Sequence, residues 1–429
     1  SGNAFDLSDG VVEVPGEVPT IQEAIDASSN GDTVLVAAGT YVENLVFGGK
    51  NLSLIGADSS NTIIDGDSVS QVINLKNGED STTVIKNFTL RNGIGFEGNG
   101  SAILMGGGAN GGYGPKLENL CITQNYGGAI KSFGSTFSLK NSRIINNHDW
   151  GIGFQYLQLS TLDNVIISGN QGRGVDIESS GASPVFNNVT ISNNVGGNGA
   201  GVRCQDQASP TFTNCVISNN TSSGGGSIYA ENSSFTMDSV TVSNNISTGW
   251  FGASINVMGT DISDKHVRIF NSTISDNTTT GGPAAGIYIF HIDSVTIIST
   301  EILDNSGGST GGLKIQQVNY FNMSNSLVAE NIGEYYGGVS FLSTGPSLSS
   351  RSENPARITN CTIADNSYTD TNSSEDQSAG LMVERWAFVS VINSIISSNQ
   401  SPGITLGNNS TDGPAVLTVN YSLISDGQD

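Results

Sequence analysis

The feature that most constrains this chain is a degenerate repeat built around a seven-residue motif, Asn-Cys-Val-Ile-Ser-Asn-Asn at residues 214–220. Related segments begin at Asn141, Asn164, Asn188 and Asn271, and the intervals between copies run from 22 to 35 residues. Self-similarity at such a period is typical of solenoids. The repeat therefore predicts a fold in which each unit packs only on its neighbours.

Each motif is followed by a glycine and a second short strand, as in the segments that start at Gly174 and Gly312. A third strand then leads into the next motif, for example at residues 184–187. Three short strands per coil, each sending every second side chain inward, predict a three-faced solenoid. We expect an all-β parallel β-helix of about 13 coils, one for each recognisable motif copy.

The fourth residue of the motif is aliphatic along the chain, which predicts a stack of β-branched side chains in the core. The members of this stack are Ile122, Ile144, Ile167, Ile191, Ile217, Val242, Ile274, Ile302, Val328, Ile363 and Ile396. The last motif residue is Asn in most copies, from Asn125 to Asn399. We predict that these amides stack as a hydrogen-bonded ladder and that the asparagines take left-handed backbone conformations.

The N-terminal residues 1–32 are predicted to cap the solenoid. Thr20-Ile-Gln-Glu23 matches a helix capping box, and we expect a helix of about ten residues there. Strands at 33–36 and 41–47 then open the first coil. The whole chain, 1–429, is expected to form one β-helix domain with coils over 33–429 and long loops near 343–355 and 368–378.

Three N-terminal segments carry a family resemblance: PTIQEAI at 19–25, GDTV at 31–34 and AGTYVEN at 38–44. They resemble the start of the pectin-lyase-like superfamily, and the Asn-rich coils resemble its generic right-handed parallel β-helix repeats. The resemblance covers nearly the whole chain and implies a right-handed coil. This superfamily includes polysaccharide lyases, glycoside hydrolases, epimerases, esterases, phage tailspikes and adhesins. The resemblance therefore implies a carbohydrate partner without fixing the reaction.

The balance of charged residues limits which classes of molecule this protein could bind. There are 39 acidic and 16 basic residues, a formal net charge of −23. Such a surface repels nucleic acid and anionic membranes, so neither is expected as a partner. No apolar stretch is long enough to cross a bilayer, and no motif for an organic cofactor is present. The four cysteines lack metal-binding spacing and are predicted to be buried thiols.

The ends of the chain suggest processing. It starts at Ser1 without Met and stops at Asp429 after a complete repeat. We expect a secreted or cell-surface protein, monomeric, from which a signal and a C-terminal segment have been removed.

Candidate chemistry gathers on the strand that follows the glycine. Its first outward position carries polar or aromatic side chains: Lys131, Gln155, Asp176, Arg203, Tyr229, Asn256, Tyr288 and Lys314. Two residues further on, the second outward position includes Glu178, Gln205 and Glu231. Because coils rise by ~4.8 Å, close to the length of a sugar unit, a glycan along this face could meet one pair per sugar.

The predicted catalytic residues are Asp176, Glu178, Arg203 and Glu231. In a hydrolase, two of the three carboxylates would act as acid and base. In a lyase, Asp176, Glu178 and Glu231 would hold Ca²⁺ against a uronate, while Arg203 or Tyr229 removes a proton. Alternatively, these charges form ion pairs that merely decorate the sheet.

The remaining predicted residues would contact the substrate. They are Lys131, Trp150, Gln155, Gln205, Tyr229, Trp250, Asn256, Tyr288 and Lys314. Trp150 and Trp250 lie in turns and are expected to be exposed for stacking on sugars. A second patch comprises His291, Asp293, Lys314 and Glu384-Arg385-Trp386.

Two functions from different classes remain open. The first is an exported polysaccharide-degrading enzyme, either a lyase or a glycoside hydrolase. The second is a non-catalytic adhesin or glycan-binding solenoid, which the scarcity of basic residues favours. An ice- or mineral-binding surface is the weakest alternative, because regular Thr-x-Thr rows are missing.

Overall fold

A computed structural model describes residues 9–95, 100–106, 112–156, 158–178, 181–261, 264–344, 354–370, 376–407 and 414–426. The chain is an all-β parallel solenoid of about 15 turns, slightly more than the 13 predicted, with one short helix in the described part. It divides into two compact units, residues 1–195 and 196–429, called unit 1 and unit 2 below. Most of the two predicted long loops lies outside the described residues.

Unit 1 contributes strands to two sheets, which we call the post-glycine sheet and the motif sheet. Its post-glycine strands are β4 (Leu45–Val46), β7 (Ile73–Leu75), β10 (Gly100–Gly106), β13 (Gly128–Phe133), β15 (Ile152–Gln155) and β17 (Val175–Glu178). Its motif-sheet strands are β1 (Val11–Val14), β2 (Thr33–Val36), β3 (Gly39–Val42), β5 (Ser53–Gly56), β6 (Thr62–Asp65), β8 (Val84–Lys86), β9 (Thr89–Arg91), β11 (Tyr113–Glu118), β12 (Cys121–Thr123), β14 (Thr136–Ile145), β16 (Thr161–Ser168) and β18 (Val185–Ser192).

Unit 2 repeats both sheets. Its post-glycine strands are β20 (Val202–Gln205), β24 (Ile228–Glu231), β28 (Ile255–Met258), β32 (Ile287–Phe290), β36 (Leu313–Gln316), β40 (Val339–Leu342), β44 (Leu381–Val383) and β47 (Ile404–Leu406). Its motif-sheet strands are β21 (Thr211–Thr213), β22 (Val216–Ser218), β25 (Phe235–Asp238), β26 (Thr241–Ser243), β29 (His266–Phe270), β30 (Thr273–Ser275), β33 (Ser294–Ile298), β34 (Glu301–Leu303), β37 (Tyr320–Ser324), β38 (Leu327–Ala329), β41 (Ala356–Thr359), β42 (Thr362–Ala364), β45 (Phe388–Ile392), β46 (Ile395–Asn399), β48 (Val416–Asn420) and β49 (Leu423–Asp426).

A third sheet of very short strands follows the ladder asparagines. Its strands in unit 2 are β23 (Thr221–Ser222), β27 (Ile246–Ser247), β31 (Thr278–Thr279), β35 (Ser306–Gly307), β39 (Ile332–Gly333) and β43 (Ser367–Tyr368), while β19 (Val195–Gly196) spans the division between the units in sequence. The predicted three-strand coil is therefore a simplification, because most coils place two strands in the motif sheet.

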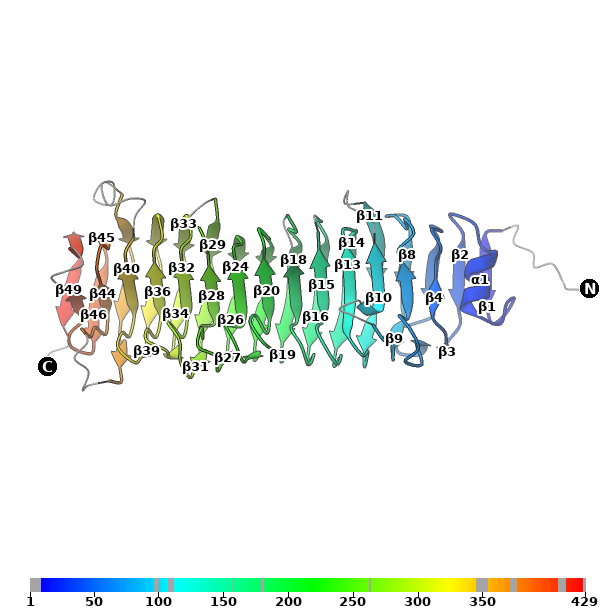
Figure 1. Cartoon of the computed structure of the whole chain (residues 1–429), viewed down its shortest axis with the longest axis horizontal. Helices are drawn as coiled ribbons and strands as arrows, with labels where there is room; N and C mark the ends of the chain where they lie inside the picture. Colours follow the sequence, from blue (N-terminus) through cyan, green and yellow to red (C-terminus); the bar gives the residue numbers. More distant parts are fainter. Residues whose placement is uncertain are drawn as a thin grey trace, which may run out of the picture. The chain divides into compact units, whose positions relative to one another are not determined.

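The N-terminal helix α1 (Ile21–Ala27) is shorter than predicted (Figure 1). Thr20 accepts a hydrogen bond from the Glu23 amide at 3.2 Å, as the capping box predicts. The carboxylate of Glu43 accepts from the first two helical amides at 2.9 Å, which satisfies further donors at this helix end. One prediction was wrong here: β1 precedes the helix and pairs in parallel with β2, so the first coil starts before the helix.

The aliphatic stack at the fourth motif position is buried in both units, as predicted. The asparagine ladder is also confirmed: each side-chain amide donates to the carbonyl of the next asparagine. In unit 1 these bonds measure 2.9–3.0 Å and join Asn125, Asn147, Asn170 and Asn194. In unit 2 they measure 2.9–3.1 Å and join Asn220, Asn245, Asn277, Asn305, Asn331, Asn366 and Asn399.

The left-handed backbone does not lie where it was predicted. The ladder asparagines are not left-handed; the residue before each one is, for example Gln124 (φ 56°) and Asn146 (φ 54°). The first motif residue is left-handed as well, as at Asn141 (φ 49°). The chain thus turns one residue earlier, which leaves the ladder side chain free to point into the solenoid and reach the next coil.

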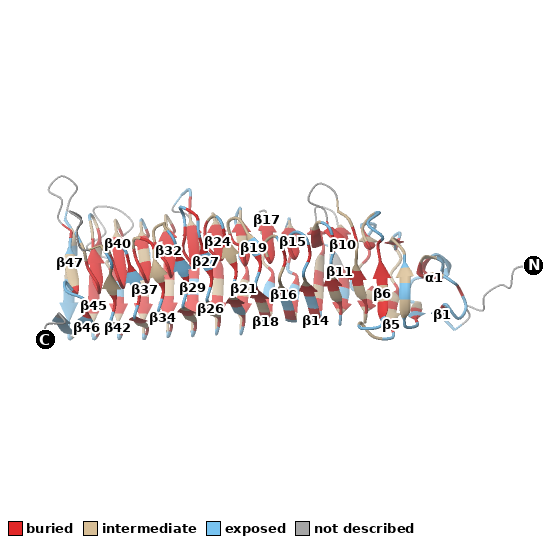
Figure 2. Ribbon diagram, turned by 90° about the horizontal axis from the view of Figure 1, so that it is seen from below, coloured by how far each residue is buried: buried red, intermediate tan, exposed pale blue. Residues whose placement is uncertain are grey.

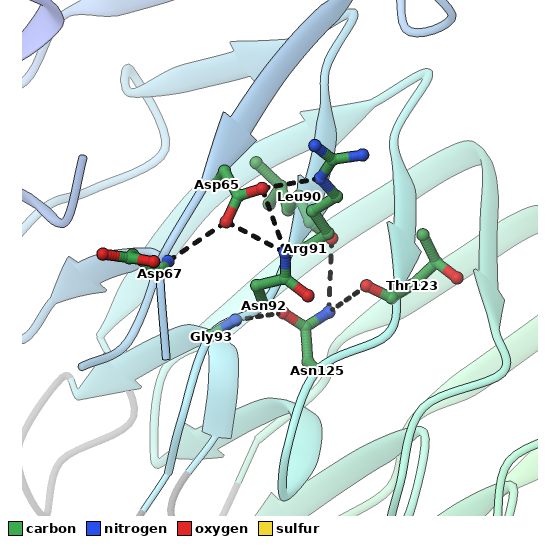
Figure 3. A network of polar contacts seen from close by, with 8 residues as sticks. All are labelled: Asp65, Asp67, Leu90, Arg91, Asn92, Gly93, Thr123 and Asn125. Atoms are coloured by element: carbon green, nitrogen blue, oxygen red, sulfur yellow. Dashed lines mark hydrogen bonds and ion pairs between the residues drawn. The ribbon is translucent and has the colours of Figure 1, made fainter. Parts of the chain in front are cut away.

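A polar network closes the N-terminal end of the unit 1 ladder (Figure 3). The Asn125 carbonyl accepts from the Gly93 amide at 2.9 Å. Asp65 accepts from Arg91 at 2.8 Å and from the side chain of Asn92 at 3.0 Å. Burial opposes ionisation of Asp65, but its hydrogen bonds from Asn92, Arg91 and the Asp67 amide together hold its pKa below the ordinary value.

A glycine precedes most post-glycine strands, and close packing between coils requires it at several of them. A β-carbon at Gly286 would lie 2.4 Å from the carbonyl oxygen of Gly312, and one at Gly312 would lie 2.5 Å from that of Gly338. A β-carbon at either glycine would overlap the next coil, whereas the small side chains of Ser227 and Ser254 are accommodated at the corresponding positions before β24 and β28. The four cysteines are thiols, as predicted, and three of them are buried. No helix in the described residues has the length and apolarity needed to cross a membrane.

Candidate functional site

The strand register fixes which side chains stand next to one another on the post-glycine sheet. In unit 1, Lys131, Gly153 and Asp176 form the first outward row, while Phe133, Gln155 and Glu178 form the second. Gln155 was therefore assigned to the wrong row. The error arose because the segment has two glycines, and Gly151 rather than Gly153 occupies the tightly packed position before the strand.

Unit 2 follows the predicted rows. The first row aligns Arg203, Tyr229, Asn256, Tyr288, Lys314 and Ser340. The second row aligns Gln205, Glu231, Met258, Phe290, Gln316 and Leu342.

The first row is largely covered by protein, which the sequence did not predict. Lys131, Asp176, Tyr229, Asn256 and Tyr288 are all buried. The turn before each strand folds over this row, so that a β-carbon on Gly225, which lies in such a turn, would approach the rings and amides of the row within 3.1 Å. Figure 2 shows strands such as β17 and β24 in the colour of buried residues. The second row is half-buried and remains accessible to a ligand.

The two tryptophans behave differently. Trp250 is 92% exposed, as expected for a residue that could stack on a sugar. Trp150 is only 8% exposed, so the prediction of an exposed ring was wrong. Its indole lies over Gly128 and Gly153, with the Lys131 ammonium 5.2 Å from the ring centroid. Two glycines without side chains leave the space that this indole fills.

In unit 1 the structure brings together three predicted residues, Lys131, Asp176 and Glu178. The Lys131 ammonium lies 3.0 Å from the Glu178 carboxylate. Asp176 lies 3.5 Å from the Arg173 guanidinium. Only Glu178 has a substantially accessible side chain, 35% exposed.

A fifth charged residue, Asp149, lies at the rim of this cluster. Asp149 is exposed at the surface, and it caps its own turn by accepting from the Trp150 amide at 2.9 Å. Nearby protein atoms still displace enough water to raise the pKa of Asp149; the charge of Asp176 adds to this, while the Trp150 amide and Arg173 oppose it. A carboxyl whose pKa is raised in a cluster of charges is a candidate general acid.

An aromatic surface lies on the same side of the turns. Tyr126 and His148 stack with ring centroids 4.5 Å apart and an angle of 3° between their planes. Both residues are exposed, and His148 directly precedes Asp149. A flat exposed ring pair next to Asp149 in sequence could stack on a sugar ring.

Sequence reasoning missed Asp149 and Arg173 as site residues. Both lie in turns just before post-glycine strands, outside the rows that the alternation defines. The available signal was their position in the turn, one or two residues before Gly151 and Gly174.

The predicted residues of unit 2 form smaller groups. Gln205 donates to the Glu231 carboxylate at 2.9 Å. Arg203 stands beside Tyr229 in register, and burial raises the Tyr229 pKa, with Glu231 adding to the shift and Arg203 opposing it. Asn256 donates to the Phe251 carbonyl, while its own side-chain oxygen is buried and has no hydrogen-bond partner among the described residues.

A second perturbed pair lies further along unit 2. Burial lowers the pKa of Lys314, and the negative charge of Glu384 opposes this shift. Burial raises the pKa of Glu384, and the positive charge of Lys314 opposes that shift. Lys314 donates to Ser309 at 3.2 Å and lies 5.9 Å from the Tyr336 ring centroid. Tyr336 also hydrogen-bonds Glu384. Tyr288, next to Lys314 in the row, has its pKa raised to about 12 by burial.

The residues predicted to hold Ca²⁺ are engaged otherwise. Asp176 and Glu178 each face a cationic side chain of unit 1. Among the described residues, no group of three or more His, Cys, Asp or Glu side chains is placed to hold a metal ion. These residues therefore do not fit a calcium site.

Comparison with known proteins identifies the family. A family profile described as "Right handed beta helix region" matches residues 71–238 and 200–428. Because these ranges cover most of the chain, the protein belongs to this right-handed β-helix family. A comparison with curated proteins finds no match.

Among solved structures, the fold is similar to the A-module of the Azotobacter vinelandii mannuronan C-5 epimerase AlgE6, with 17% identity, 95% of each chain covered and a TM-score of 0.50. The catalytic domain of a GH87 α-1,3-glucanase in complex with tetrasaccharides aligns with 15% identity over 96% of this chain and 68% of that chain, at a TM-score of 0.45. The GH87 α-1,3-glucanase catalytic unit from Streptomyces thermodiastaticus strain HF3-3 aligns with 13% identity over 95% and 66%, at a TM-score of 0.38. At these identities the similarity concerns the fold.

Proposed function

We propose that this protein is an exported enzyme that hydrolyses a polysaccharide, with its active site on the turns and post-glycine strands of unit 1. The observation that carries the proposal is the surface carboxyl of Asp149, whose pKa is raised within a cluster of opposite charges. The similarity to the epimerase module supports a polysaccharide only through the shared fold.

In this proposal, Asp149 donates a proton to the glycosidic oxygen as the bond breaks. Glu178 supplies the second carboxylate, as base or nucleophile, because its side chain is accessible and is oriented by Lys131 at 3.0 Å. Asp176 is a positioning residue: its negative charge favours the protonated form of Asp149. Tyr126 and His148 would stack against a sugar ring next to the bond that is cleaved.

The test is a panel of neutral and acidic polysaccharides, read by the release of reducing ends and by the ultraviolet absorbance of unsaturated uronates. We expect reducing ends without unsaturation, and we expect Asp149→Asn and Glu178→Gln to abolish the release. Asp163→Asn is the matched control, since Asp163 accepts a hydrogen bond from Asn187 at 2.8 Å on the motif sheet of the same unit. Full activity of Asp149→Asn would overturn the assignment, and binding without any turnover would favour the non-catalytic alternative.

A lyase or another proton-abstracting enzyme is the second candidate, and a separate observation favours it. Burial lowers the pKa of Lys314, and this shift favours the neutral form, which is the form that acts as a base. Unsaturated product from an acidic polysaccharide, lost in Lys314→Met and retained in Asp149→Asn, would move the active site to unit 2. Chelation of divalent cations during the same assay tests the predicted dependence on Ca²⁺.

A further inference from the structure

On the outer face of the motif sheet in unit 2, one row of neighbouring side chains contains two arginines and no acidic residue. Strands β29, β33, β37 and β41 align Arg268, Thr296, Asn322 and Arg357 side by side. Adjacent parallel strands lie ~4.8 Å apart, so the α-carbons of the two arginines are about 14 Å apart. Both arginines are exposed, and neither forms an ion pair with the described residues.

The sheet is hollowed along the Thr296, Asn322 and Arg357 part of this row, and Arg268 lies beside Thr296 on the next strand, outside the lining of the hollow. A depression of about 360 Å³ is lined by Thr296, Tyr320, Asn322 and Arg357, among others, and no Asp or Glu belongs to its described lining. Tyr320 is 50% exposed and stands beside Asn322 on β37. Its ring offers an apolar platform at the edge of the depression.

The charge of this surface contrasts with that of the whole protein, which carries a net charge of −23. The carboxylate of Asp293, just before β33, is engaged by Asn319 at 3.1 Å and lies 3.9 Å from His266. Two guanidinium groups without an ion pair among the described residues can attract an anion locally, even in an acidic protein. Guanidinium groups bind carboxylates through paired hydrogen bonds.

We propose that this depression, which we call the arginine trough, binds a stretch of acidic polysaccharide. Arg268 and Arg357 would each pair with a carboxylate, Tyr320 would stack on a sugar ring, and the two neutral side chains between the arginines would bond hydroxyl groups. Widely spaced cations separated by hydroxyl and amide groups fit a chain of sugars. They do not fit the dense charge of nucleic acid, which the net charge of the protein would repel. The trough is separate from the Asp149 cluster, and the inference does not depend on hydrolysis.

The test is a binding experiment with the full chain carrying Asp149→Asn, so that hydrolysis at the proposed site cannot consume the ligand. The probes are polygalacturonate and alginate, with methyl-esterified polygalacturonate as the uncharged comparison. Affinity would be measured by calorimetry for the Asp149→Asn protein, for the added pair Arg268→Gln and Arg357→Gln, and for Tyr320→Ala. Arg143→Gln is the matched control, since Arg143 is an exposed arginine on β14 of unit 1.

We expect the acidic polymer to bind more tightly than its ester, and the double glutamine variant to lose about tenfold in affinity, because two charge-assisted hydrogen bonds are removed. Added salt should weaken binding to the unaltered trough more than binding to the double variant. The control should bind like the parent, and unchanged thermal unfolding would show that the variants are folded. Equal binding by the double variant, equal binding of the ester, or no binding of either acidic polymer would each overturn the proposal.

Discussion

The ammonium of Lys131 lies 3.0 Å from the carboxylate of Glu178, although strand β15 separates the strands that carry these two residues. The lysine side chain reaches its partner by passing over Gly153, where a β-carbon would lie 2.8 Å from Lys131 Cδ and 3.0 Å from the Trp150 ring. The ion pair thus ties three successive coils together beneath the indole. A glycine in the middle coil is the condition for this contact.

Replacing that glycine should therefore destabilise the protein. We expect Gly153→Ala to lower the free energy of unfolding by about 1–3 kcal/mol, because the added methyl group overpacks the space between Lys131 and Trp150. Urea denaturation would measure the loss. Gly281→Ala is the matched control, since a β-carbon there meets no atom within 4 Å. Equal stability of the two variants would contradict this view of the contact.

Replacing Asp149 should lower the rate of hydrolysis without lowering the stability of the folded protein. If it is the general acid, Asp149→Asn should lower the rate of hydrolysis by about 10²–10⁴-fold. A raised pKa in the folded state contributes stability below the ordinary carboxyl pKa, and that contribution is lost as pH rises through the raised value. At neutral pH the variant should therefore be at least as stable as the wild type.

The pH profile gives an independent measurement at the same residue. Activity should fall as pH rises through the raised pKa of Asp149, and Asp176→Asn should move that fall to lower pH by removing a neighbouring negative charge. If the loss of activity at high pH occurs at the same pH in Asp176→Asn as in the wild type, a group other than Asp149 causes that loss.

Asp65 should make the folded protein less stable at low pH, the opposite of the effect expected for Asp149. Its pKa is depressed in the folded state, so its contribution is present above the ordinary carboxyl pKa and is lost as pH falls through the depressed value. We expect Asp65→Asn to reduce the loss of thermal stability between neutral and acidic pH. Melting temperatures across that range would test this, and parallel curves for variant and wild type would exclude the effect.

The asparagine ladder should be sensitive at any interior position. Asn277→Ala removes a donor and an acceptor from a buried chain of bonds, to Asn305 at 2.9 Å and from Asn245 at 3.0 Å. We expect a loss of about 1–3 kcal/mol, because the backbone and side-chain amides of Asn245 lose their buried acceptor and the Asn305 carbonyl loses one of its two donors. Asn322→Ala, at a half-buried position on the outer face, should cost much less. A similar loss in both variants would argue against a special role for the ladder.

The sequence allowed the coil to be predicted well and the site only in part. The aliphatic stack and the ladder repeat once per coil, so a local pattern specifies them wherever the motif occurs. Glu178 was correctly recognised as an outward carboxylate by alternation alone. Gln155 was misplaced by one row because two glycines occur in its segment, and only the packing of Gly151 against the next coil decides between them.

What the sequence by itself determined is the repeating geometry: parallel coils, an inward stack and the face on which polar residues gather. Only the tertiary structure decided which of those residues are accessible, because access depends on how non-repeating turns fold over the sheet. The turns bury Asp176 and Trp150, bring Asp149 to the rim, and leave Tyr126 and His148 exposed. Strand alternation is a local property of the backbone, whereas the cover over a strand comes from turns whose paths no local pattern specifies.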